Sequence, residues 1–103
     1  MKTTIRFFEK PHCTGNARQK AILLSAGHRL ITENLLEFPF TREELRSFFG
    51  ALPVAQWFNP LSPKVKSGEV DIHSMDEAQA LAAMLAEPLL IRRPLMEVGS
   101  VRL

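Results

Sequence analysis

The first third of the chain alternates between strand-like and helix-like patterns of apolar positions. Residues 3–8 carry apolar or aromatic side chains on both faces of a period of two, which predicts an interior strand. Pro11 ends this strand, and the residues after it predict a helix running to about Ser25, with Gly27 as its stop signal. Residues 28–34 alternate again and predict a second strand.

Capping signals predict a helix near the middle of the chain. Thr41 and Glu44 are spaced as a capping box, with apolar residues placed to form a hydrophobic staple. We therefore expect a short helix from Thr41 through about Phe49, stopped by Gly50. Short helical turns and loops should follow, because this segment contains Pro53, Pro60 and Pro63.

The last third predicts one more helix and two strands. Ser74 and Glu77 form a second candidate capping box. The helix after it has an apolar stripe at helical spacing and should end before Pro88; the stripe consists of Ala78, Leu81, Ala82 and Leu85. Residues 89–92 and 95–98 predict two short strands that pair with each other.

The order of elements is strand, helix, strand, helical insert and two strands, which indicates an α/β architecture. A helix between the first two strands makes them a parallel pair joined by a right-handed crossover. The two final strands should pair antiparallel and complete a small mixed sheet flanked by helices. At 103 residues, the chain is predicted to be one domain spanning residues 1–103.

Composition narrows the classes of function. The chain is 46% hydrophobic and 23% charged with a net charge of +2, and its acidic and basic residues are mixed. No basic stripe indicates nucleic-acid binding, and no apolar segment is long enough to cross a membrane. One cysteine excludes an internal disulfide and a multi-cysteine zinc site, so we expect a cytoplasmic protein with no bound metal.

The cysteine, Cys13, lies where the first strand gives way to the first helix. Free backbone N–H groups and the helix dipole would stabilise its thiolate there, and Gly15 would let the backbone approach the sulfur or an oxyanion. The alternative is that Cys13 is a small buried residue. Asn16 occupies the position of the second sulfur in a Cys-x-x-Cys motif, and Arg18 is one residue too close for a phosphatase loop. A thiol in this setting needs an external thiol to resolve its adducts.

The segment "LLIRRP" is the second chemical feature, because it places Arg92 and Arg93 beside Pro94. Arginine presents a planar fork that suits oxyanions, and an Arg-Pro bond is a candidate for the cis form. The alternative is a pair of surface arginines at the edge of the sheet.

The two segments together resemble the arsenate reductase and Spx family. "PHCTGNARQK" is similar to the family's cysteine loop, and "EPLLIRRPLMEVG" is similar to its Arg-cis-Pro segment. The middle segment "PVAQWFNPLSPKVKSGE" is closer to the nitrogenase-associated, glutaredoxin-like branch. The resemblance covers nearly the whole chain and implies a thioredoxin-like fold with a helical insertion before the final β-hairpin. It also implies that the family's final helix is lacking.

The resemblance implies roles for particular residues. Cys13 matches the nucleophile, Arg93 the oxyanion-binding arginine, and Pro94 the cis-proline; Gly15 is expected beside the substrate. Asn59 stands near the position of a family arginine in the substrate site, so one oxyanion ligand is missing. A charge-assisted contact to a buried anion contributes about 1.5–3 kcal/mol, which makes arsenate a poor candidate substrate.

Two functions are consistent with the sequence. The first is a monothiol oxidoreductase whose Cys13 attacks an anionic or glutathione-linked substrate. It binds no cofactor, and glutathione, glutaredoxin or another thiol protein resolves its adduct. The second is a non-catalytic thioredoxin-like adaptor or regulator that binds a protein partner and is associated with nitrogen fixation. Binding to nucleic acid or to a membrane is not expected in either case.

Overall fold

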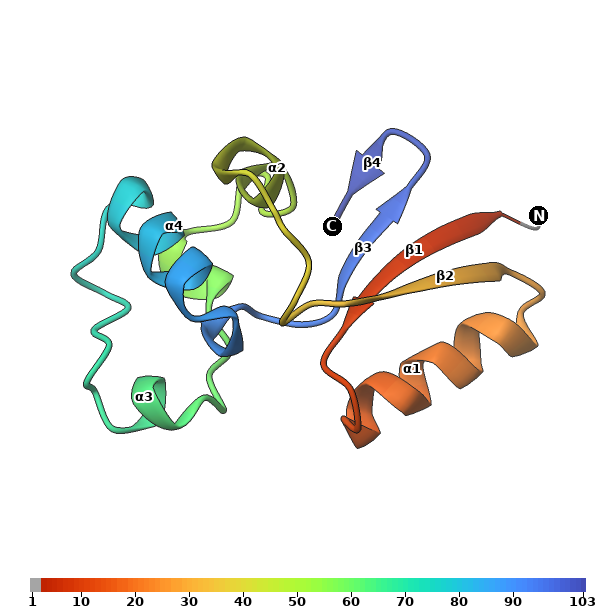
Figure 1. Ribbon diagram of the computed structural model, residues 1–103, viewed down its shortest axis with the longest axis horizontal. Helices are drawn as coiled ribbons and strands as arrows, with labels where there is room; N and C mark the ends of the chain where they lie inside the picture. The colour runs from red at the N-terminus through yellow and green to blue at the C-terminus, as the bar shows by residue number, and fades with distance from the viewer. Residues whose placement is uncertain (1–2) are drawn as a thin grey trace. The chain divides into compact units, whose positions relative to one another are not determined.

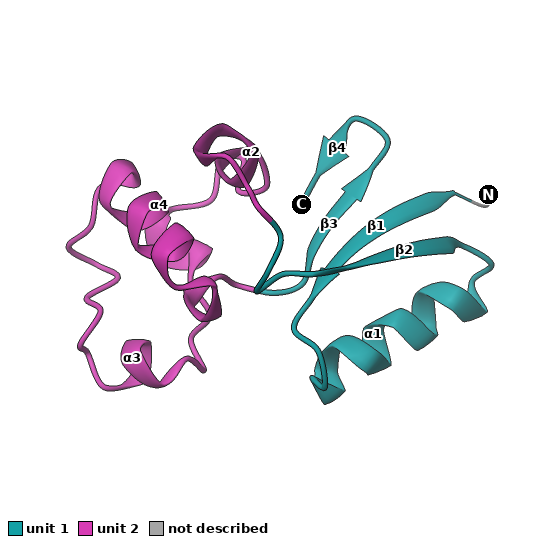
Figure 2. Cartoon of the chain, in the orientation of Figure 1, with its two compact units in different colours: residues 1–38, 93–103 teal, residues 39–92 magenta. Residues whose placement is uncertain are grey.

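The computed structural model describes residues 3–103, and the elements along them follow the predicted order in most of the chain (Figure 1). The helices and strands are β1 (Thr4–Glu9), α1 (Thr14–Ser25), β2 (Arg29–Asn34), α2 (Arg42–Ser47), α3 (Pro63–Lys66), α4 (Glu77–Ala86), β3 (Leu95–Val98) and β4 (Val101–Arg102), with 3-10 turns η1 (Val54–Trp57) and η2 (Pro88–Leu90). The chain divides into two compact units (Figure 2). One comprises residues 1–38 and 93–103, and the other residues 39–92. A single domain over residues 1–103 stays a prediction.

The first unit contains a four-stranded mixed sheet of order β2-β1-β3-β4. β1 and β2 are parallel, with Thr4 opposite Arg29, as the intervening helix α1 predicts. β3 runs antiparallel to β1 with Phe8 opposite Leu95, and β4 extends the sheet antiparallel to β3. β1 is therefore an interior strand, in agreement with the sequence.

The two faces of β1 have different surroundings. Phe7 is buried and lines a hollow together with Leu23 of α1 and Met96 of β3, so this face is turned toward α1. Phe8 points to the opposite face and packs edge-on against Phe38, with ring centroids 4.9 Å apart. The aromatic pair in β1 thus contributes apolar area on both sides of the sheet.

The second unit is built around stacked aromatic rings. Phe49 and Trp57 stack with centroids 4.8 Å apart, and the guanidinium of Arg46 lies 4.7 Å from the centre of the Trp57 ring. The indole N–H of Trp57 donates to the carbonyl oxygen of Leu52 at 2.9 Å, so the buried ring has no unsatisfied polar atom. The predicted capping box of α2 is present, since Thr41 and Glu44 bond reciprocally.

The predicted strand over residues 89–92 is wrong. Pro88 begins the 3-10 turn η2 instead, and only Ile91 forms an isolated bridge, with Phe58. Proline is favoured at the first position of a helical turn. The short apolar run after Pro88 is compatible with either a strand or a turn when only neighbouring residues are considered. The final hairpin is made by β3 and β4, and Gly99 between them has φ of 61°, a region that favours glycine.

The predicted start of the helix after residue 74 is also wrong. Its capping box is formed by Asp76 and Gln79 rather than by Ser74 and Glu77. The buried face of α4 differs from the predicted stripe and consists of Ala80, Leu81 and Met84. Met84 is fully buried, whereas Leu85 of the predicted stripe is 39% exposed. The two side chains offer similar apolar areas, so the sequence pattern alone does not distinguish the two faces.

Candidate functional site

Cys13 lies in a tight loop between β1 and α1 and is the N-cap residue of α1. The preceding residue, His12, has φ of 64°, and the Cys13 N–H donates to the carbonyl oxygen of Lys10 at 3.2 Å. No side chain caps the start of α1, so the first backbone N–H groups of the helix are not taken by a capping oxygen. These donors lie next to a thiol that is partly accessible.

The surroundings of Cys13 favour its thiolate. The backbone N–H of Asn16 is the main cause of a lowered pKa of the Cys13 thiol, and desolvation opposes it. A hydrogen bond from the Arg93 side chain and another from the backbone N–H of Gly15 lower this pKa further. The thiolate is the form that attacks disulfides and other electrophiles, so the structure supports the interpretation of Cys13 as an activated thiol.

Asn16 has a structural role that the sequence reasoning missed. Its side chain is only 3% exposed, and its Oδ1 accepts a hydrogen bond from the Lys10 N–H at 3.1 Å. Its Nδ2 donates to Oε1 of Gln19 at 3.1 Å. Asn16 therefore joins the first turn of α1 to the loop that carries Cys13. The only sequence signal for Asn16 was its position three residues after Cys13, where a Cys-x-x-Cys motif would have its second cysteine.

Arg93 and Pro94 immediately precede β3, and the peptide bond between them is cis. Antiparallel pairing of β3 with β1 returns this segment to the end of β1 that leads to Cys13. The Nη1 atom of Arg93 has almost no accessible surface and no hydrogen-bond partner among the described residues. The guanidinium therefore retains an N–H group that could donate a hydrogen bond to an anionic group beside Cys13.

The remaining predicted site residues have different surroundings. A Cβ atom placed on Gly15 would lie 3.9 Å from the sulfur of Cys13, an ordinary contact, so Gly15 is adjacent to the thiol as expected. Asn59 belongs to the unit of residues 39–92 and is buried. Its Oδ1 accepts from the N–H of Leu61 at 3.1 Å, and its own N–H donates to Leu90. This bonding stabilises a turn, and a role of Asn59 in binding substrate stays a prediction.

A hollow of about 320 Å³ opens beside Cys13 on the side of the strand end. Its charged lining residues are Glu9, Lys10 and Lys20, and His12 also faces it. The ammonium group of Lys20 donates to both carboxylate oxygens of Glu9, at 2.9 Å for Oε2. We call this hollow the Lys10 pocket. Its size falls at the lower end of the range of small-ligand sites.

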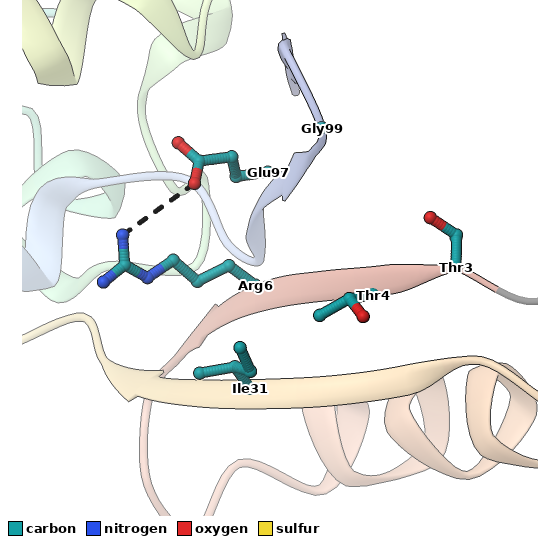
Figure 3. A pocket seen from close by; sticks show the side chains of 6 residues that line it. All are labelled: Thr3, Thr4, Arg6, Ile31, Glu97 and Gly99. Atoms are coloured by element: carbon teal, nitrogen blue, oxygen red, sulfur yellow. Dashed lines mark ion pairs between the residues drawn. The ribbon is translucent and has the colours of Figure 1, made fainter.

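A larger hollow, of about 650 Å³, lies on the sheet and is lined by residues that include Arg6, Ile31 and Glu97 (Figure 3). Arg6 lies 3.8 Å from Glu97 and 3.6 Å from Glu33, so two carboxylates neutralise its charge. The side chains that line this hollow include no thiol and no imidazole. We therefore take the surroundings of the Cys13 thiol, whose pKa is lowered, as the candidate functional site.

Among residues 3–103, no group of three or more His, Cys, Asp or Glu side chains is placed to hold a metal ion.

None of the helices in that part of the chain combines the length and the apolar character needed to cross a membrane.

Known structures share this architecture. An arsenate reductase from Vibrio cholerae superposes with a TM-score of 0.82 and 20% identity, covering 99% of this chain and 89% of that one. A putative ArsC family related protein from Bacteroides fragilis gives 0.83 and 22% identity, covering 97% and 89%. The chain therefore shares the fold of these structures, which is the thioredoxin-like architecture that the resemblance implied.

The sequence itself matches a protein of Rhodospirillum rubrum described as an uncharacterized 15.7 kDa protein in the draG 3' region. The two are 52% identical over 98 residues, which cover 95% of this chain and 68% of that protein. The chain therefore belongs to the same family as the R. rubrum protein. No protein-family model matches this chain.

Proposed function

We propose that this protein is a cytoplasmic monothiol oxidoreductase that removes glutathione from mixed disulfides by means of Cys13. The observation that carries the proposal is the placement of the Cys13 thiol. It lies between the first N–H groups of α1 and the guanidinium of Arg93, which lower its pKa. The fold shared with arsenate reductases supports a thiol reaction at this position but leaves its substrate open.

The reaction requires one external thiol. In the first step the Cys13 thiolate attacks the glutathionyl sulfur of a mixed disulfide. The old S–S bond breaks, the substrate thiolate leaves and takes a proton from water, and Cys13 becomes glutathionylated. In the second step the thiolate of a free glutathione attacks this adduct, which forms glutathione disulfide and regenerates the Cys13 thiolate. Overall, the mixed disulfide and one free glutathione give the substrate thiol and glutathione disulfide, so the substrate sulfur is reduced and the sulfur of the free glutathione is oxidised. A glutaredoxin is an alternative second thiol.

Arg93 would act on the anionic substrate. Its unpartnered Nη1 can donate to a carboxylate or another oxyanion, while the same guanidinium stabilises the sulfur anion. Arsenate fits less well, because the resemblance implies that this chain has Asn59 where the family has an arginine, and one missing charge-assisted contact corresponds to about 1.5–3 kcal/mol. A substrate with a single negative group near the sulfur demands fewer cationic ligands than a trianion.

Mass spectrometry after treatment with glutathione disulfide tests the proposal. We expect one glutathionyl group on Cys13, its removal by added glutathione, and no adduct on the Cys13→Ser variant. Turnover is measured with a glutathionylated peptide, and arsenate is the comparison substrate. A Cys13 that stays unmodified at neutral pH, or an adduct that glutathione cannot remove, would refute the oxidoreductase.

The alternative is a thioredoxin-like adaptor associated with nitrogen fixation. The observation that favours it is the location of the R. rubrum relative in the draG 3' region. Under this alternative, Cys13→Ser retains its function in cells, because no step needs the thiol. Complementation of a deletion strain by wild type and by Cys13→Ser separates the two functions: loss of complementation with Cys13→Ser supports the enzyme.

A further inference from the structure

We propose that the Lys10 pocket binds a carboxylate of the glutathionyl group that reacts at Cys13, with the Lys10 ammonium as its counter-ion. This inference rests on the proposed function and deepens it, because it assigns a specificity-determining residue. The ligand class is a small peptide disulfide that bears a carboxylate within reach of its reactive sulfur.

The charges of the pocket leave one lysine without an ion pair. Lys20 is neutralised by Glu9, whose side chain is largely buried, and both oxygens of that carboxylate accept from the ammonium group. No ion pair involves Lys10 within residues 3–103, and its side chain is only partly exposed. The pocket therefore carries the uncompensated charge of Lys10 in addition to the positive end of α1.

The backbone holds Lys10 in place before a ligand arrives. Its N–H donates to the buried Asn16 side chain, and its carbonyl oxygen accepts from the Cys13 N–H. Two bonds thus fix the backbone of Lys10 on either side of the turn that positions the thiol. A cation on a prearranged backbone loses less conformational freedom on binding than one on a mobile loop.

The pocket and Arg93 provide two donors for anionic groups at the same thiol. The pocket opens beside Cys13 and has a volume of about 320 Å³, at the lower end of the range of small-ligand sites. The Arg93 side chain lowers the pKa of the Cys13 thiol, and its buried Nη1 has no hydrogen-bond partner among the described residues. Glutathione has two carboxylates, so one can pair with Lys10 while its sulfur meets Cys13.

A comparison of two disulfides tests this assignment. The rate constant for modification of Cys13 is measured with glutathione disulfide, which is anionic, and with bis(2-hydroxyethyl) disulfide, which is neutral. Lys10→Gln should slow the reaction with glutathione disulfide about fivefold and leave the neutral disulfide unaffected. The ratio of the two rates cancels any change in the pKa of Cys13, because both reactions use the same thiolate.

Arg18→Gln is the matched control, since it also removes one positive charge but lies on α1, outside the residues that line the pocket. It should leave the ratio near that of wild type. An unchanged ratio in Lys10→Gln overturns the assignment, and so does an equal fall in both variants, which would indicate general attraction of anions. If wild-type Cys13 reacts with neither disulfide, the proposed function itself has failed; reaction with both and no effect of Lys10 refutes the pocket alone.

Discussion

Replacing Asn16 by Ala tests whether the loop that carries Cys13 is held by a buried side chain. The substitution removes the oxygen that accepts from the Lys10 N–H and the amide that donates to Gln19. The Lys10 N–H is partly buried in this bond, so it loses its partner without full access to water.

The cost follows from these contacts. Leaving a buried donor unsatisfied costs about 1–3 kcal/mol. Losing the part-buried hydrogen bond to Gln19 adds little, because the exposed Gln19 side chain can turn to water instead. The free energy of unfolding should therefore fall by about 1–3 kcal/mol in Asn16→Ala. The protection of the Lys10 amide against hydrogen exchange should fall by roughly one order of magnitude, since 1.4 kcal/mol corresponds to a factor of ten.

Asn16→Asp is the matched control, because it retains an oxygen at the same place. It should keep the Lys10 amide protected, and its carboxylate favours the N-terminal end of α1. The added negative charge lies in the same turn as the thiol and should raise the pKa of Cys13, which alkylation rates across pH would show. The Ala variant should thus affect chiefly the loop, and the Asp variant chiefly the thiol.

Native-state hydrogen exchange followed by NMR is the primary assay, with urea denaturation as the measure of global stability. An Asn16→Ala variant with wild-type stability and a protected Lys10 amide would show that Asn16 does not hold the loop. A pKa of Cys13 unchanged in Asn16→Asp would show that this position does not influence the thiolate.

Three further predictions concern charge and packing. Arg93→Ala should raise the pKa of Cys13, because a hydrogen bond and a positive charge are lost; the pH profile of alkylation should move to higher pH, and an unmoved profile would contradict this. The folded-state pKa of Cys13 lies below its ordinary value of 9.0, so the unfolded chain binds more protons between the two values. We therefore expect the free energy of unfolding of wild type, relative to that of Cys13→Ser, to increase as pH rises from the folded-state pKa to 9.0. This pH-dependent gain should vanish as pH falls through the folded-state pKa. A difference between the two proteins that does not change with pH would refute this. Arg46→Ala should lower the free energy of unfolding by about 1 kcal/mol and change Trp57 fluorescence, because it removes the cation over the ring and an exposed ion pair with Glu77. Glu77→Gln removes the ion pair and leaves the cation over the ring, so its effects on unfolding and on fluorescence should be smaller. Equal effects of the two substitutions would count against the ring contact.

Local signals in the sequence predicted many elements well. The strand β1, the helix beginning at Cys13 and the capping box of Thr41 and Glu44 depend on residues close in sequence, and each was found. The errors occurred where two local patterns compete. Residues 88–91 are compatible with a strand or a turn, and two overlapping capping boxes precede α4. Leu90 and Met84 are buried, and such burial, which local sequence patterns do not determine, selects between them.

The Asn16 side chain illustrates why part of the site escaped prediction. A polar residue among polar neighbours on a helix has no apolar period that would indicate burial. Its burial depends on the path of the loop before Cys13, and its partner, the Lys10 N–H, is a backbone group that no side-chain pattern reveals. Similarly, Lys10 and Lys20 are equivalent in the sequence, and only Glu9 at the end of β1 distinguishes them.

The sequence by itself determined the chemical inventory of this protein: one thiol at the start of a helix, no second cysteine to resolve its adducts, and an Arg-Pro pair downstream. The tertiary structure decided which groups act together. Antiparallel pairing of β3 with β1 returns Arg93 to Cys13, about 80 residues away along the chain, and burial of Asn16 orders the loop that carries Cys13. The reason is physical, because helix caps and turns form from neighbouring residues, whereas strand pairing and side-chain burial depend on contacts that exist only once the chain has folded.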